Sequence, residues 1–213
     1  MGRRALIALF GVLSLAVAVA AGRAFGDALA ESTLRAWLDL GYTLLKGGVI
    51  VAFTVFVARR GPARRRRREP VALLACGAAI FSVLALQRPE ASVATAVVIG
   101  GELLAVVSGV WMLGATLALG RCFGVLPEAR GLVTGGPYRV VRHPLYLGEL
   151  GACAGLVIAS PSGWNFALAV VFAVAQGARM RMEEQELSHQ FPEYGAYAAR
   201  TPRLIPLRRG ATT

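Results

Sequence analysis

The sequence predicts an all-α, polytopic integral membrane protein, a bundle of about six transmembrane helices with five as the alternative. Two observations favour this class. The residues AVILMFWYC make up 56% of the 213 positions, and only 16% are charged. The apolar residues also form long runs, which arginine-rich segments separate. A soluble domain of this length could not bury so much apolar surface, and a disordered chain requires low hydrophobicity.

Six apolar runs follow one another along the chain, and the first five approach or exceed the length of a membrane helix, about 20 residues. They span residues 5–22, 36–58, 71–87, 93–120, 145–160 and 166–177. The first run follows Arg3 and Arg4, as the core of a secretory signal would. It is longer than such a core and further spans follow it, so we expect a retained helix. The sixth run continues as a polar helix as far as His189.

The basic residues predict the orientation of these helices. If the N-terminus is cytoplasmic and six helices alternate in direction, 19 of the 23 basic residues lie on the cytoplasmic side. Only Arg23, Arg35 and Arg88 then lie outside, and Lys46 lies within a helix. This asymmetry follows the positive-inside rule. We therefore expect a multi-pass protein with both termini cytoplasmic, in the plasma (inner) membrane of a prokaryote.

The net charge of +11 would suggest a nucleic-acid partner in a soluble protein. Here the densest run, Arg64–Arg68, lies between two apolar spans. It is better explained as a topology anchor that contacts anionic membrane lipid, without nucleic acid. The same run divides the chain into an N-terminal hairpin with its arginine-rich loop, residues 1–69, and a membrane core, residues 70–213. The oligomeric state stays open.

Other kinds of site have no support in the sequence. Cys76, Cys122 and Cys153 form no Cys-x-x-Cys pattern, and the chain has only two histidines, so we expect no disulfide framework and no metal site. No Gly-x-Gly-x-x-Gly follows a predicted strand, which argues against a Rossmann cofactor domain. Hydrolase signatures such as Gly-x-Ser-x-Gly are also missing.

Polar residues gather in two predicted cytoplasmic segments, of which residues 131–149 are the first. Its Gly-Gly-Pro run at 135–137 is a strong turn signal. His143 precedes Pro144, and proline suits the first turn of a helix. Arg142 and His143 are therefore placed at a helix N-terminus, where free N–H groups and the helix dipole favour an anion. Tyr146 follows within the first turn.

The second polar segment, residues 179–186, extends the sixth helix into the cytoplasm. Arg179 and Glu183 are four residues apart and share a face. Its three carboxylates need a cationic partner beside a membrane surface, or else form a solvated, self-paired helix end. With an anion site on one segment and carboxylates on the other, a zwitterionic or cationic ligand that carries a carboxylate would be bound at both ends.

These residues resemble the isoprenylcysteine carboxyl methyltransferase family, to which the membrane phospholipid methyltransferases are related. The matching motifs are Gly-Gly-Pro-Tyr-Arg-x-x-Arg-His-Pro-x-Tyr at 135–146, Glu183-Glu184, Glu193-Tyr194-x-x-Tyr197 and Arg203-Leu-Ile-Pro206. The resemblance covers roughly residues 100–206. It implies an all-helical membrane enzyme that transfers a methyl group from S-adenosylmethionine, held in a pocket at the cytoplasmic face. One departure is Phe191-Pro192, where Phe-Gly is more usual.

The resemblance also implies site residues. It assigns cofactor binding to Arg142, His143, Pro144, Tyr146, Glu183, Glu184 and Tyr197. It assigns catalysis to Arg179 and Glu183, with Arg179 facing the carboxylate of the acceptor. The expected acceptor is a lipophilic molecule that enters from the bilayer, most simply a prenylcysteine-type carboxylate, which is ionised at neutral pH and needs no base.

Three alternatives stay open. A phospholipid amine or a thiol could be the acceptor, and would need deprotonation by Glu183 or Glu184. Membrane reductases of the sterol type share a similar Arg-His-Pro-x-Tyr region and bind NADPH, although they are usually longer than 213 residues. A non-enzymatic lipid-binding membrane protein is the third alternative.

Overall fold

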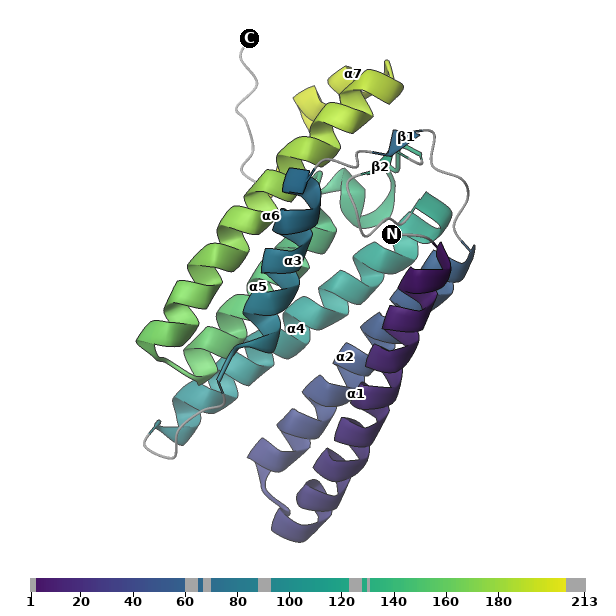
Figure 1. Ribbon diagram of the computed structural model, residues 1–213. Helices are drawn as coiled ribbons and strands as arrows, with labels where there is room; N and C mark the ends of the chain where they lie inside the picture. Colours follow the sequence, from purple (N-terminus) through teal and green to yellow (C-terminus); the bar gives the residue numbers. More distant parts are fainter. Residues whose placement is uncertain are drawn as a thin grey trace.

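The computed structural model describes residues 3–59, 65–66, 70–87, 93–122, 128–129 and 131–205, and these form seven α-helices (Figure 1). The helices are α1 (Arg3–Glu31), α2 (Leu34–Arg59), α3 (Pro70–Leu84), α4 (Thr95–Leu119), α5 (Pro144–Ala159), α6 (Gly163–Gln190) and α7 (Tyr194–Arg200). Two 3-10 turns, η1 (Gly120–Cys122) and η2 (Gly136–Arg139), and one antiparallel pair of two-residue strands, β1 (Arg65–Arg66) and β2 (Glu128–Ala129), complete these ranges. The predicted all-α class is confirmed.

Each of the six apolar runs coincides with one of the helices α1–α6, in the predicted order, although three runs, 71–87, 93–120 and 145–160, extend one to three residues beyond a helix end. Helix α1 continues to Glu31, beyond the end of its apolar run at residue 22, because the alanine-rich residues that follow also favour a helix. Among the described residues, two helical stretches have the length and composition of a membrane span: Gly11–Glu31, with mean hydropathy 1.6, and Thr95–Leu119, with 2.0. Apolar but shorter helices cover Pro70–Val83 and Pro144–Ala159. The number of spans stays a prediction.

The distribution of side chains around α4 is the reverse of a water-soluble helix. Large apolar residues face outward, as Val107 does with 65% of its surface exposed, whereas the buried residues of α4, apart from Val98, are small or polar, as the completely buried Ala105 is. Similar exposed apolar side chains, Leu74 and Val174, lie on α3 and α6. Large exposed apolar surfaces are unfavourable in water but suit contact with lipid, where small residues mediate the contacts between helices.

Helices α4 and α5 approach each other through glycine. A Cβ atom added to Gly101 would lie 2.5 Å from both the backbone nitrogen of Ala159 and the backbone oxygen of Gly155. A Cβ on Gly155 would lie 2.5 Å from the backbone oxygen of Gly101. Only glycine allows this separation, as in the small-xxx-small contacts of membrane helices. The contact fixes α5, which carries the first polar segment at its N-terminal end.

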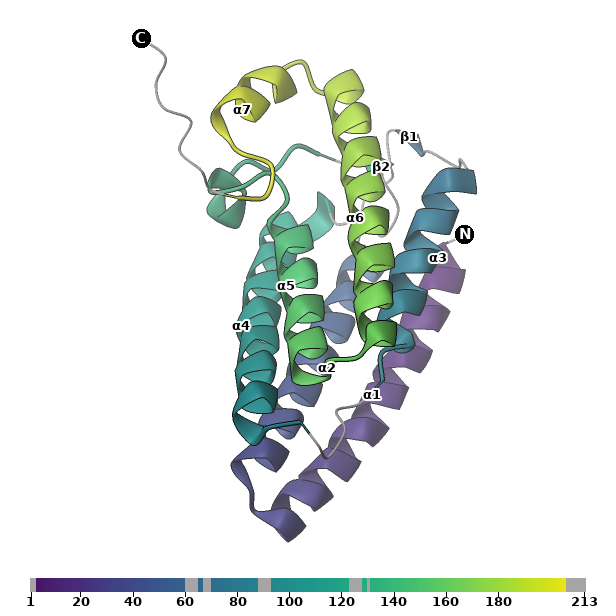
Figure 2. The ribbon, with the colours of Figure 1, turned by 90° about the vertical axis from the view of Figure 1, so that its left-hand side faces the viewer.

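Helix α3 packs against α6, far from it in sequence (Figure 2). Ala79 of α3 contacts a core of buried residues that includes Phe172 of α6. Asn165, completely buried near the start of α6, accepts a hydrogen bond from Gln87 N (2.9 Å) and donates to Gln87 O (3.2 Å) and Ser160 O (2.8 Å). One amide thus joins the segment after α3 to the α5–α6 connection.

The two ends of the molecule differ in character. The N-terminus, the β1–β2 pair and α7 lie at one end, and the α1–α2 and α5–α6 connections lie at the other (Figure 1). Helices α1 and α2 form a hairpin beside α4, with Ala28, Ala36 and Leu40 buried between them. The end that holds α7 carries both polar segments, so the candidate site is assembled there.

Candidate functional site

The turn before α5 has the backbone that the sequence predicts. Gly136 adopts φ +57°, a left-handed conformation that favours glycine. Pro144 is the first residue of α5, and His143 precedes it with φ −124° and ψ 61°. The indole Nε1 of Trp111, on α4, donates a hydrogen bond of 2.8 Å to Pro144 O. These contacts hold the N-terminal end of α5 against the C-terminal half of α4.

The segment that follows α7 supports the same turn. The backbone N–H of Arg142 donates to Pro202 O at 2.8 Å, and that of His143 donates to Arg203 O at 3.1 Å. Residues 202–203 therefore lie alongside residues 142–143. The backbone positions the side chains of Arg142, His143 and Arg203 at one place.

Tyr197 of α7 makes a second connection to this region. Its hydroxyl donates to Tyr138 O at 2.7 Å. Burial, and then the neighbouring Tyr194, raise the pKa of Tyr197 to about 12, so the hydroxyl keeps its proton and remains a donor. Phe191, Tyr194 and Tyr197 form a small buried cluster behind it. The cluster fixes α7 across the end of the site.

Glu184 of α6 is the centre of the ion pairs. His143 Nε2 lies 2.9 Å from its Oε1, so Nε2 carries the proton in this hydrogen bond. Arg142 Nη1 lies 3.2 Å from the same oxygen, and Arg203 binds both oxygens, with Nη2 2.7 Å from Oε2 and Nε 3.1 Å from Oε1. Burial raises the pKa of Glu184, but His143, Arg142 and Arg203 lower it more, and its net shift is downward. Glu184 is therefore ionised at neutral pH.

Glu183, its neighbour, binds a different partner. The hydroxyl of Tyr146 donates to Glu183 Oε2 at 3.0 Å. The ring of Tyr146 also packs edge-on against the imidazole of His143, with ring centres 5.4 Å apart. Glu184 thus binds the residue before α5, His143, and Glu183 binds Tyr146 in the first turn of α5.

A second polar cluster lies on the other side of Tyr146. The guanidinium carbon of Arg179 is 5.0 Å from the centre of the Tyr146 ring, a cation–π distance. Arg179 Nη1 donates to Gln176 Oε1 at 2.6 Å and lies 3.6 Å from Glu149 Oε2. Gln176 Nε2 in turn donates to Glu149 Oε2. Arg179, Gln176 and Glu149 are called the arginine cluster below.

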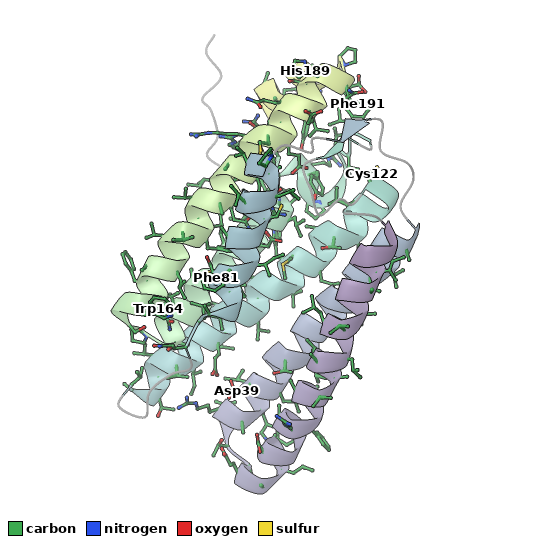
Figure 3. All side chains as sticks on the ribbon, viewed as in Figure 1. Asp39, Phe81, Cys122, Trp164, His189 and Phe191 are labelled. Atoms are coloured by element: carbon green, nitrogen blue, oxygen red, sulfur yellow. The ribbon has the colours of Figure 1, made fainter. Side chains whose placement is uncertain are left out.

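An open depression of about 330 Å³ adjoins the ion pairs of Glu184. Its lining residues are Arg181, Glu184, Gln185, Ser188, Tyr194 and Arg203. Both charge signs and two hydroxyl groups therefore face one space. His189 and Phe191 mark this end of the molecule in Figure 3.

All of the predicted site residues lie at this end. Arg142, His143, Tyr146, Arg179, Glu183 and Glu184 are joined by direct contacts, while Pro144 and Tyr197 fix the backbone around them. The structure adds three residues that the sequence prediction did not include: Arg203, Glu149 and Gln176. Sequence features could have identified two of them. Arg203 begins the Arg-Leu-Ile-Pro run, and Glu149 lies three residues after Tyr146, on the same helix face.

The donor set suits a charged organic ligand. In the part of the chain that the structure describes, no group of three or more His, Cys, Asp or Glu side chains could hold a metal ion. Arg142 Nε is buried and has no hydrogen-bond partner. A buried donor of this kind is satisfied by an acceptor such as a carboxylate. S-adenosylmethionine carries a carboxylate, an ammonium and a sulfonium, so the mixed charges of the site fit it.

Comparisons with known proteins indicate a family for part of the chain. The family model described as phospholipid methyltransferase matches residues 90–194. The cobalt-zinc-cadmium resistance protein CzcN of Cupriavidus metallidurans is 40% identical over 111 residues, which are 48% of this chain and 51% of that protein. The nickel-cobalt-cadmium resistance protein NccN of Alcaligenes xylosoxydans xylosoxydans is 41% identical over 103 residues, 46% of this chain and 48% of that protein. The chain thus spans about half the length of the curated relatives it matches.

Proposed function

We propose that this chain, which belongs to the phospholipid methyltransferase family through residues 90–194, methylates a lipophilic acceptor with S-adenosylmethionine. The family and the apolar helices support a membrane methyltransferase. The observation that carries the proposal is the convergence of Arg142, His143 and Arg203 on Glu184 beside the first turn of α5.

We assign the cofactor to this convergence. Arg142, with its unpartnered buried Nε, would bind the carboxylate of S-adenosylmethionine. Glu183 and Glu184 would offset its positive charges, and His143, Pro144, Tyr146 and Tyr197 would shape the pocket. When bound, S-adenosylmethionine supplies an electrophilic methyl group. The residues of the chain then have to orient the acceptor and exclude water, which are the main requirements of an in-line displacement.

The arginine cluster is the proposed acceptor side of the site. A carboxylate of the prenylcysteine type is the first candidate acceptor, because Arg179 can orient a carboxylate through its planar fork. Such a nucleophile is already ionised at neutral pH. The acceptor chain would enter from the bilayer, past the exposed apolar faces of the helices.

One observation favours a second candidate, an amine or a thiol. Glu149 Oε2 lies 3.6 Å from Arg179 and partly neutralises its charge. A carboxylate beside the acceptor would repel another carboxylate, whereas it would attract an ammonium or accept a proton from a neutral nucleophile. The names of the two relatives concern resistance to metals and indicate no acceptor.

The proposal includes a membrane topology. Six helices, α1–α6, would cross the plasma (inner) membrane of a prokaryote, with both termini and the site at the cytoplasmic face. Anionic lipid would contact the arginine run at 64–68. The grouping of the N-terminus, β1–β2 and α7 at one end of the molecule supports this arrangement (Figure 1).

Thermal unfolding in detergent or nanodiscs tests the proposed cofactor. S-adenosylhomocysteine should raise the unfolding temperature, since a ligand that binds only the folded state stabilises it. NADPH should have no effect, and the variant Arg142→Met should lose most of the S-adenosylhomocysteine effect. Stabilisation by NADPH alone would favour the reductase alternative. No effect of either ligand would favour a non-enzymatic lipid-binding protein.

A further inference from the structure

The arginine cluster joins residues of two helices around one guanidinium. Glu149 comes from α5, and Gln176 and Arg179 come from α6. We propose that Glu149 and Gln176 are positioning residues, which fix the guanidinium of Arg179 over the ring of Tyr146 and thereby align the acceptor. This inference rests on the proposed function, because it concerns the acceptor side of the same site.

Because this guanidinium is buried, its hydrogen-bond partners in the protein, and not water, determine its orientation. Gln176 is completely buried, and the side chains of Arg179 and Glu149 are 11% and 17% exposed. A buried cation is stable only when it is paired and hydrogen-bonded. Glu149 supplies the opposite charge, and Gln176 supplies the amide oxygen that Arg179 Nη1 donates to.

The contacts restrain the guanidinium in two ways. Gln176 and Glu149 both hold the Nη1 atom, at 2.6 Å and 3.6 Å. The ring of Tyr146 restrains the group from another side, with the guanidinium carbon 5.0 Å from the ring centre. Arginine has several rotatable bonds, so neither restraint alone would fix the plane of its fork. Together they leave it little freedom to rotate.

Gln176 and Glu149 are also fixed relative to each other. Gln176 Nε2 donates to Glu149 Oε2, so the amide donates to the carboxylate while its oxygen accepts from Arg179. This sets the orientation of the amide, because its oxygen must face Arg179. Cys76, on α3, also lies close to Arg179. Three helices therefore surround one cation.

Tyr146 connects this arrangement to the cofactor side. Its hydroxyl donates to Glu183, and its ring contacts both His143 and Arg179. A guanidinium held over this ring has a fixed position relative to the residues assigned to the cofactor. In-line displacement tolerates little misalignment, and an error of about 1 Å can cost about 100-fold in rate. Loosening Arg179 should therefore lower the turnover number and leave cofactor affinity unchanged.

A double-mutant cycle tests whether Glu149 acts through Arg179. Glu149→Gln, Arg179→Met and the double variant are compared in nanodiscs with transfer of a radiolabelled methyl group. An S-farnesylcysteine derivative, phosphatidylethanolamine and a long-chain alkanethiol are offered, and the acceptor that the wild type methylates fastest is used. The matched control is Glu102→Gln, which removes another buried glutamate, on α4.

If Glu149 is a positioning residue, Glu149→Gln lowers kcat about tenfold or more and changes the Kd of S-adenosylhomocysteine by less than threefold. In the Arg179→Met background the same substitution changes kcat less than twofold. An equal loss in both backgrounds, or an unchanged kcat in the wild-type background, would overturn the proposal. Glu102→Gln should leave kcat near the wild-type value.

A second measurement needs no acceptor. The guanidinium ¹⁵N signal of Arg179, assigned by its loss in Arg179→Met, should show slow rotation in the wild type and in Glu102→Gln. It should show fast rotation in Glu149→Gln and in Gln176→Leu. Slow rotation in both of those variants would also overturn the proposal. Failure of the proposed function itself is distinguishable, because the wild type would then neither bind S-adenosylhomocysteine nor methylate any acceptor offered.

Discussion

His143 Nε2 lies 2.9 Å from Glu184 Oε1, although 41 residues separate the two in the sequence. The contact joins the N-terminal end of α5 to the part of α6 that the sequence predicts to be cytoplasmic. Arg142 Nη1 reaches the same oxygen, and Arg203 binds both oxygens. One carboxylate therefore organises three basic side chains from two separate segments, and the first predictions test this arrangement.

Replacing His143 with alanine should weaken cofactor binding. The change removes a hydrogen bond to a charged group, which is worth about 1.5–3 kcal/mol, or roughly 10–150-fold in Kd. Isothermal titration of S-adenosylhomocysteine into nanodisc-embedded protein measures this. The matched control is His189→Ala, at an exposed position on α6, which should bind normally. Equal affinity of His143→Ala and the wild type would place the cofactor elsewhere.

Arg203→Lys should also weaken the binding of S-adenosylhomocysteine, by roughly threefold to tenfold. Lysine keeps the charge but cannot reproduce the fork with which Nη2 and Nε bind both oxygens of Glu184. Arg200→Lys is the control, since Arg200 is exposed and its Nε bonds only within α7, to Ala196 O. Titration of both variants gives the comparison, and equal effects would show that the fork of Arg203 is unimportant.

The stability conferred by Glu184 should depend on pH. Its pKa is lower in the folded protein than in the unfolded chain, so its ionised form stabilises the folded state. This contribution is present above the ordinary glutamate pKa of about 4.3 and is lost as the pH falls through the lower, folded value. The unfolding temperatures of the wild type and Glu184→Gln should therefore differ most near pH 7 and converge as the pH falls below the ordinary glutamate value. Glu193→Gln is the control, because Glu193 is exposed, and its unfolding temperature should stay close to that of the wild type at every pH.

Two adjacent glycines of α4 should respond differently to alanine. At Gly101 a Cβ would overlap the backbone of α5, and such overpacking costs about 1–3 kcal/mol. At Gly100 the same Cβ would have nothing within 4 Å. Thermal unfolding in one detergent should therefore show a lower midpoint for Gly101→Ala and an unchanged or higher one for Gly100→Ala. Equal midpoints would contradict the close α4–α5 contact.

Cysteine labelling tests the topology. In a background without Cys76, Cys122 and Cys153, a membrane-impermeant thiol reagent applied from outside should label Ser32→Cys, in the α1–α2 connection. Ser188→Cys, on the exposed surface of α6, should react only after the membrane is permeabilised. Both follow from the positive-inside distribution of arginine. Labelling of Ser188→Cys in intact cells would overturn the orientation.

The sequence predicts where the helices lie in the chain, but it does not predict which helices pack against each other. The apolar runs mark α1–α6 because a run of this length has few alternatives to a helix. They do not show that α3 packs on α6, since a helix that is apolar all round has no distinct face to direct its packing. The pair of Arg65–Arg66 with Glu128–Ala129 is also unpredictable, because two-residue strands leave no periodic pattern.

The site was predictable where its residues form a compact motif. The run that ends in His143, Pro144 and Tyr146 carries its own turn and helix-start signals, and these hold in the structure. Gln176 lies within an apolar stretch of α6, where an isolated amide gives no sign of its partner. Its contact with Glu149, on the preceding helix, depends on how α5 and α6 are packed, and residue spacing does not determine that.

The position of Arg203 has a consequence for biosynthesis. At about 5–20 residues per second, a ribosome adds Arg203 roughly 3–12 seconds after His143. During elongation the nascent chain therefore already contains His143 and Glu184 but lacks the side chain that spans both oxygens of Glu184. A messenger RNA with a stop codon at position 202 would encode every helix described above and would still leave the ion-pair centre incomplete.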